Sequence, residues 1–163
     1  MNGIYIIIGG NLGDRLALIK DCKHKIENEI GIISRCSSIY ESESWGETDN
    51  PTYLNQVLYV ESIFSAKEVL EKALEIEKKL GRTRDKKWES RLIDIDILFF
   101  NDDIIDVKDL KVPHPHLQNR KFVLAPLNEI ASEFVHPILK KSMKELLVEC
   151  KDNLKVTKII PKL

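Results

Sequence analysis

Hydrophobic residues recur with two different periods along the chain, which predicts a mixture of strands and helices. Residues 4–8 form a short apolar run that ends at two glycines, as expected for a buried strand followed by a sharp turn. Apolar positions then recur at helical spacing over 12–30, and Gly31 stands where a helix would end. Residues 32–39 and 53–64 are predicted to be strands, the second with clear alternation of apolar and polar positions.

The second half of the chain continues this mixture. A capping box at residues 65–68 opens a predicted helix that runs to Leu80, with Leu70, Ala73 and Leu80 on its apolar face. The remaining predicted elements are strands over 92–100 and 104–107, helices over 119–130 and 142–150, and a strand over 154–160. This order indicates an α+β fold: a ferredoxin-like antiparallel or mixed sheet with helices on both faces, in three layers.

Two polar loops, over 42–51 and 82–91, interrupt the predicted elements. Loops of this length without structure of their own are often functional. We therefore expect the functional residues to lie in and beside these loops.

Composition narrows the class of protein. A length of 163 residues fits one domain, 1–163, and the net charge of −1 gives no global attraction to nucleic acid or to anionic membranes. Three widely spaced cysteines predict neither a disulfide framework nor a zinc site. No signal peptide or membrane-spanning run is present, so we expect a cytoplasmic protein, and a monomer.

The predicted strand over 92–100 carries two acidic residues, Asp94 and Asp96. Alternation places them on one face with Leu98 and Phe100, and places Ile93, Ile95, Ile97 and Phe99 on the other. Two ionised carboxylates side by side repel each other unless a cation lies between them. The pair therefore favours a magnesium site over the alternative, an edge strand with a solvated acidic face.

The preceding loop is rich in basic residues: Arg82, Arg84, Lys86, Lys87 and Arg91. Arginine binds phosphate in a bidentate manner and stabilises the charge that develops during phosphoryl transfer. A solvated loop is the alternative, but the position of this cluster directly before the aspartates favours phosphate binding.

Three further polar residues lie near these segments. His114 and His116 are separated by Pro115, and no third zinc ligand is evident, so a phosphate contact from His114 beside Arg120 fits better than a metal. Packing of a proline-rich turn is the alternative. Glu77 is expected to face inward from its helix, with a structural role first and a catalytic one second.

Several separated motifs agree with one known family. They are residues 9–15, 51–55, Glu77, 81–84, 91–97, 112–114 and 119–122. On these motifs the chain resembles the 6-hydroxymethyl-7,8-dihydropterin pyrophosphokinases across nearly its whole length. The Arg-x-x-Asp-hydrophobic-Asp segment at 91–96 is the family's signature.

The resemblance implies a ferredoxin-like fold and transfer of diphosphate from ATP to a pterin hydroxymethyl group, releasing AMP in folate biosynthesis. It implies two Mg²⁺ ions held by Asp94 and Asp96, which would be catalytic together with Arg82 and Arg91. The ATP-binding residues would be Glu77, Arg82, Arg84, Trp88, Arg91, Ile97, His114 and Arg120. The pterin-binding residues would be Ser42, Trp45, Tyr53, Asn55 and Phe122.

The chain departs from the family pattern at Leu74, Lys87, Glu89 and Pro115, which puts ATP affinity rather than metal binding in question. Two other readings remain open from the residues. One is a different magnesium-dependent nucleotidyl or phosphoryl transferase, which would not explain Tyr53, Asn55 and Phe122. The other is a non-enzymatic ferredoxin-like module that binds RNA or a regulatory ligand, which would need a basic face.

Overall fold

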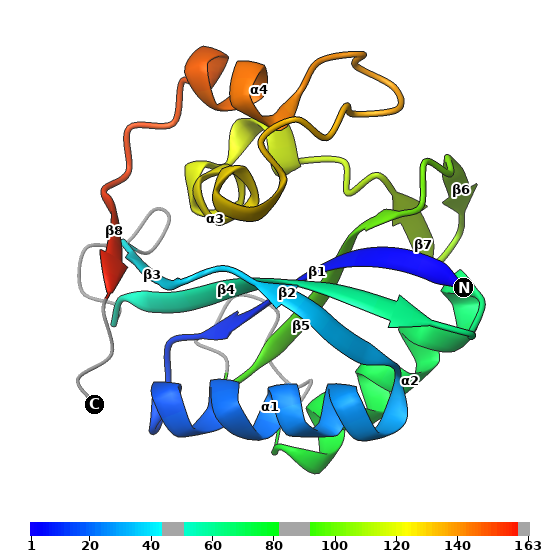
Figure 1. Ribbon diagram of the computed structural model, residues 1–163. Coiled ribbons are helices and arrows are strands. Elements are labelled where there is room, and N and C mark those ends of the chain that lie inside the picture. The colour runs from blue at the N-terminus through cyan, green and yellow to red at the C-terminus, as the bar shows by residue number, and fades with distance from the viewer. Residues whose placement is uncertain (44–50, 82–91, 160–163) are drawn as a thin grey trace.

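A single antiparallel sheet forms the centre of the molecule (Figure 1). The computed structural model describes residues 1–43, 51–81 and 92–159. The strand order is β5-β1-β4-β3-β8, and β2 also pairs with β4. The strands are β1 (Asn2–Gly10), β2 (Ile32–Cys36), β3 (Ile39–Ser42), β4 (Tyr53–Ser62), β5 (Asp94–Phe100) and β8 (Val156–Ile159).

Two helices cover each face of this sheet. Figure 1 shows α1 (Arg15–Glu29) and α2 (Ala66–Lys79) on one side, and α3 (Lys121–Ala131) and α4 (Met143–Glu149) on the other. A 3₁₀ turn, η1 (Leu117–Asn119), precedes α3. A separate hairpin joins β6 (Ile105–Val107) to β7 (Leu110–Val112). The predicted three-layer α+β architecture is confirmed, with an antiparallel sheet.

Local sequence signals account for where the helices begin. The Asp14 side chain accepts a hydrogen bond from the Ala17 backbone N–H and caps α1. Ser65 and Glu68 form the predicted capping box at the start of α2. No helix in the described part of the chain is both long and apolar enough to cross a membrane.

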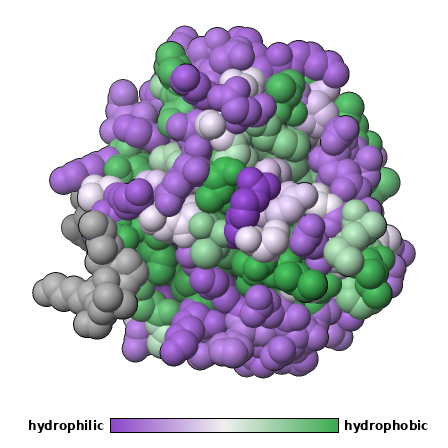
Figure 2. Space-filling model, in the orientation of Figure 1, coloured by the Kyte–Doolittle hydropathy of each residue, from purple (hydrophilic) through white to green (hydrophobic). Residues whose placement is uncertain are grey.

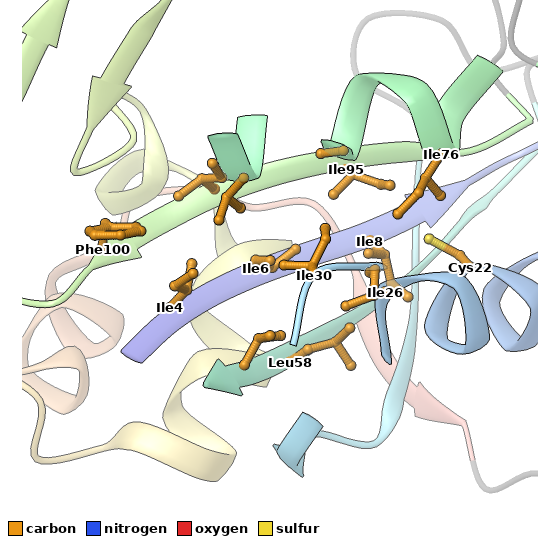
Figure 3. Close-up of a cluster of buried hydrophobic side chains, with 14 of the residues drawn as sticks. Ile4, Ile6, Ile8, Cys22, Ile26, Ile30, Leu58, Ile76, Ile95 and Phe100 are labelled. Carbon is orange, nitrogen blue, oxygen red and sulfur yellow. The ribbon is translucent and has the colours of Figure 1, made fainter. Parts of the chain in front are cut away.

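The main hydrophobic core lies between the sheet and α1 and α2. Alternate residues of β1, Ile4, Ile6 and Ile8, point into this core, where they meet Ile26 of α1 and Ile76 of α2 (Figure 3). All five side chains are fully buried. The burial of these apolar side chains is the principal force that holds α1 and α2 on the sheet.

The other face of the sheet forms a second core with α3 and α4. Tyr5 and Ile7 of β1 contribute to it, as do Leu98 and Phe99 of β5. Leu98 is an extra residue in the pairing of β5 with β1, because Tyr5 lies opposite Phe99 while Ile6 lies opposite Ile97.

The alternation predicted for β5 is therefore wrong beyond Leu98. A β-bulge places two residues opposite one and reverses the faces of those that follow. Phe99 joins the second core on the side of the carboxylates, and Phe100 joins the main core with Ile95 and Ile97.

Two smaller predictions also differ from the structure. The buried face of α2 is formed by Ala66, Val69, Ala73, Ile76 and Glu77. Leu70 and Leu80 pack only at the edge of the core. Strand β7 was not predicted from the sequence because three residues carry too little periodicity to stand out.

Candidate active site

The two aspartates of β5 lie on the side of the sheet that faces α3 and α4. Asp94 and Asp96 are half-buried and alternate with the buried Ile93 and Ile95, as predicted. They share their face with Leu98, which packs in the second core. Asp94 pairs with Gly9 of β1, and Asp96 pairs with Ile7.

Glu77 holds the strand that carries these carboxylates. β5 is an edge strand, and the backbone N–H of Ile95 donates a hydrogen bond of 2.8 Å to Glu77 Oε2. The Glu77 side chain is almost completely buried. The inward orientation predicted for Glu77 is confirmed, and its contact fixes the backbone between Asp94 and Asp96.

His114 lies beside β5, close enough to Asp94 to feel its charge. Its backbone N–H donates to the Leu98 carbonyl at 3.0 Å. Burial, with the charges of Arg120 and His116, lowers the pKa of His114 to about 4, and the Asp94 carboxylate opposes this shift. Asp94, which is distant in sequence, therefore lies within electrostatic range of His114, as do the nearby His116 and Arg120.

The tautomer of His114 follows from its hydrogen bonds. The backbone N–H of His116 donates to His114 Nδ1 at 3.3 Å. A neutral imidazole whose Nδ1 accepts must carry its proton on Nε2. His114 can thus offer an N–H donor to an anion near neutral pH.

A row of three paired residues crosses the sheet next to this group. Asn55 of β4 pairs with Gly9 of β1, and Gly9 pairs with Asp94 of β5. Directly paired residues in a sheet face the same side, and two strand spacings place the Cα atoms of Asn55 and Asp94 roughly 10 Å apart. Because Gly9 has no side chain, the Asn55 amide can pack directly against the Gly9 backbone, on the side toward Asp94.

Asn55 is buried, with 7 % of its surface exposed. Its Nδ2 has no hydrogen-bond partner in the part of the chain that the structure describes. A Cβ atom added at Gly9 would collide with Asn55 Oδ1 and with the Leu54 carbonyl oxygen. A buried amide with an unused donor is suited to bind a polar ring edge.

Three other predicted ring-binding residues lie on elements of the same face of the sheet. Tyr53 begins β4 and lies on the same face as Asn55. Ser42 of β3 pairs with Tyr53. Phe122 lies in the first turn of α3, half-buried against the second core. The Arg120 guanidinium carbon lies 5.9 Å from the centre of the Phe122 ring.

Some predicted residues are not brought together on this face. The Ile97 side chain lies in the main core on the opposite side of the sheet, so only its backbone could contact a nucleotide. Trp45, Arg82, Arg84, Trp88 and Arg91 lie outside the described residues.

A hydrogen-bond network holds the segment before β4, and sequence reasoning missed it. Arg15 Nη1 donates to the Thr52 carbonyl at 2.8 Å and to Thr52 Oγ1 at 2.9 Å, and it forms an ion pair with Glu41 at 3.3 Å. Asn11 Nδ2 donates to the Pro51 carbonyl at 3.2 Å. Residues 9–15 and 51–55 both belong to the motifs singled out in the sequence, and a further signal was the arginine at the first position of a helix, where the dipole disfavours positive charge unless a specific partner compensates.

The donor set fits magnesium. Among residues 1–43, 51–81 and 92–159, no three His, Cys, Asp or Glu side chains gather into a metal cage. Mg²⁺ is usually held by one or two carboxylates, with water and substrate phosphate as its remaining ligands. Asp94 and Asp96 supply such a pair, with His114 and Arg120 nearby.

Paired carboxylates beside a neutral histidine and an arginine, on a ferredoxin-like sheet, define an enzyme that acts on phosphate groups. The family model described as 7,8-dihydro-6-hydroxymethylpterin-pyrophosphokinase matches residues 5–132. The chain belongs to this family.

Relatives across bacteria carry the corresponding enzyme name. A 2-amino-4-hydroxy-6-hydroxymethyldihydropteridine pyrophosphokinase from Aquifex aeolicus is 41% identical over 149 residues, covering 91% of this chain and 92% of that protein. A protein of the same name from Bacillus subtilis is 38% identical over 135 residues, covering 82% of this chain and 81% of that protein.

The fold also matches solved structures. The Plasmodium falciparum HPPK-DHPS crystal structure with pteroate gives a TM-score of 0.74 at 18% identity over 91% of this chain. The chain spans 42% of that larger protein. This likeness concerns the fold.

Proposed function

We propose that the protein transfers the terminal diphosphate of ATP to the hydroxymethyl group of 6-hydroxymethyl-7,8-dihydropterin, releasing AMP, in folate biosynthesis. The family and the names of the relatives support this activity. The observation that carries it is the row of Asn55, Gly9 and Asp94, because a buried amide with an unused donor, on the same face as the paired carboxylates, supports a polar ring site beside a metal and phosphate site.

The reaction moves one group between two oxygens. The pterin hydroxyl oxygen forms a bond to the β-phosphorus, and the bond from that phosphorus to the oxygen of the α-phosphate breaks. The β- and γ-phosphates leave with the pterin, AMP carries the electrons of the broken bond, and the hydroxyl proton is released. Such a displacement depends on in-line positioning and charge neutralisation rather than on a covalent nucleophile.

Asp94 and Asp96 would hold the magnesium, with two ions expected. When bound, Mg²⁺ would neutralise charge on the phosphates. Glu77 supports this role because its hydrogen bond to Ile95 N–H fixes the backbone between the two carboxylates.

His114 and Arg120 would contact the ATP phosphates. The low pKa of His114 keeps the imidazole neutral, with an N–H donor on Nε2. Arg120 supplies a permanent positive charge beside it. Arg82, Arg84, Trp88 and Arg91 are proposed to complete the nucleotide site.

The pterin would lie across the row beside Gly9. The unused Nδ2 donor of Asn55 supports a hydrogen bond to the ring edge. Tyr53 and Phe122 would contact the ring faces, since aromatic faces bind flat heteroaromatic rings well. Ser42 and Trp45 are proposed to complete this pocket.

The departures from the family pattern leave the two aspartates intact. Leu74 is half-buried on α2 and Pro115 is exposed before η1. We therefore expect an active enzyme, acting as a cytoplasmic monomer, whose ATP affinity differs from that of its relatives. Membership of the family decides against the non-enzymatic alternative.

A product assay tests the proposed function. The purified protein is incubated with ATP and Mg²⁺, with and without 6-hydroxymethyl-7,8-dihydropterin, and AMP and ADP are separated by chromatography. AMP formed only with the pterin establishes both the acceptor and attack at the β-phosphorus. Formation of ADP, or no product from a folded protein that binds ATP, would overturn the proposal.

A further inference from the structure

A hollow lies on the reverse side of the sheet, away from the row of Asn55, Gly9 and Asp94. It is a pocket of about 640 Å³ between α1 and the strands β2, β3, β4 and β8. Figure 2 shows hydrophobic surface between the hydrophilic surface of the lower helix layer and the elements above it. The volume is in the range of small-molecule sites.

The wall of this pocket is apolar. Ile19 of α1 lines it together with Ile33 of β2, Ile39 of β3 and Ile159 of β8. An apolar wall with a few placed polar groups is the usual composition of a small-molecule site.

One of those polar groups is Gln56, which follows Asn55 in β4 and therefore faces the opposite side of the sheet. Gln56 is 5 % exposed, and its Nε2 donates to the Ser37 carbonyl at 2.6 Å. Its Oε1 is buried without a hydrogen-bond partner in the described residues. An unmet buried acceptor is costly, and an N–H or O–H donor at this wall would satisfy it.

The rim of the pocket is positive on balance. Lys20 and Lys23 line it one helical turn apart, and Glu27 is the acidic residue of the same rim. Within the described ranges neither lysine has an ion-pair partner. Lys23 Nζ lies 3.9 Å from the Sγ of Cys36.

We propose that this pocket binds a small aromatic acid: a flat apolar body with one anionic group and one N–H donor. The body packs on the isoleucines, the anion pairs with Lys20 and Lys23, and the donor meets Gln56 Oε1. The site is independent of the ATP and pterin site because β4 separates the two, with Asn55 on one face and Gln56 on the other.

A fluorescent probe with this chemistry tests the proposal directly. 1-Anilinonaphthalene-8-sulfonate has an aromatic body, a sulfonate and an N–H, and it is titrated into the full chain. The test variant is Lys20→Gln/Lys23→Gln, and the matched control is Lys25→Gln/Lys67→Gln. Each variant removes two positive charges from the layer formed by α1 and α2. Lys20 and Lys23 line the pocket, whereas Lys25 and Lys67 do not.

We expect saturable binding that weakens about tenfold in the test variant, since each ion pair contributes modestly to affinity. The control should change by less than about twofold. Equal weakening in both variants, no weakening in the test variant, or no saturable binding would overturn the proposal.

Alkylation of Cys36 gives a second readout that needs no variant. Cys36 is exposed and lines the pocket, whereas Cys22 is fully buried. Saturating probe should slow iodoacetamide labelling of Cys36, followed by peptide mass spectrometry, while labelling of Cys150 stays unchanged. An unchanged rate at Cys36 would place the bound probe elsewhere and overturn the assignment.

Discussion

Asn55, Gly9 and Asp94 each contribute something different to one row of the sheet. Asn55 presents an unused amide donor, Asp94 presents a carboxylate, and Gly9, which lacks a side chain, lets the Asn55 amide pack against its backbone. The sequence alone indicated Asp94, because Asp94 and Asp96 alternate with isoleucines and therefore share one face of the strand. The residues did not indicate the role of Asn55, which came from the family resemblance, because pairing across strands is invisible without the register.

Asn55→Ala should raise the KM for the pterin about ten- to a hundredfold, because it removes a hydrogen bond to a buried ring edge. The KM for ATP should stay near the wild-type value. Steady-state kinetics with each substrate varied in turn measure both constants. An equal rise in both, or an unchanged pterin KM, would remove Asn55 from the pterin site.

Gly9→Ala should affect pterin binding through Asn55, because the added methyl group collides with Asn55 Oδ1, and it should also lower stability, because the methyl group collides with the Leu54 carbonyl oxygen. We expect a higher pterin KM in the Gly9→Ala protein and little further rise when it is combined with Asn55→Ala. A double-mutant cycle on pterin KM measures this coupling. Fully additive effects would show that the two residues act independently.

At the scale of elements, β5 is the strand on which the site depends. Its pattern predicted the strand and its two faces as far as Leu98. The reversal beyond Leu98 could not be predicted, because a bulge is defined by pairing with β1. The outer edge of β5 donates a buried hydrogen bond to Glu77 of α2, and periodicity predicted only that the Glu77 side chain faces inward.

Glu77→Ala should lower both the free energy of unfolding and kcat, because it leaves the Ile95 N–H without its acceptor. The loss of stability should be about 1–3 kcal/mol. Glu77→Gln keeps an acceptor oxygen and should retain most of both. Urea unfolding and turnover assays on the two variants separate these effects. A Glu77→Gln protein as impaired as Glu77→Ala would show that the charge, rather than the hydrogen bond, matters.

At the scale of the molecule, one sheet carries two cores and two distinct faces. The order of elements and the caps at Asp14 and Ser65 could be predicted, because they depend on local periodicity and side-chain chemistry. The contacts of Arg15 with Thr52 and of His136 with its own turn could not, because they depend on how distant or irregular segments pack.

His136 makes the stability of the second helical layer depend on pH. Its Nδ1 accepts hydrogen bonds from the backbone N–H groups of Ile138 and Leu139, both at 3.1 Å, and its ring packs against Phe99. Burial lowers the pKa of His136 below its ordinary value. The unfolded chain therefore takes up a proton at a higher pH than the folded one, and stability falls as pH drops below about 6.5.

His136→Asn should remove this part of the pH dependence while keeping an acceptor for the turn. Urea unfolding at pH 7.5 and pH 5.0 should show a smaller loss of stability in His136→Asn than in the wild type. His114, whose pKa is also lowered, to about 4, remains in both proteins and cancels from the comparison. An identical loss in both proteins would show that His136 is not the group responsible.

The central claim is that Asp94 and Asp96 hold the metal for transfer of diphosphate to the pterin. The most direct measurement is pterin-dependent AMP formation by Asp96→Asn, beside the control Asp102→Asn in the exposed turn after β5. We predict that Asp96→Asn lowers kcat about a thousandfold with an unchanged circular dichroism spectrum, because the strand tolerates the amide and the metal does not. Asp102→Asn should turn over normally. Near-normal AMP formation by Asp96→Asn would contradict the account.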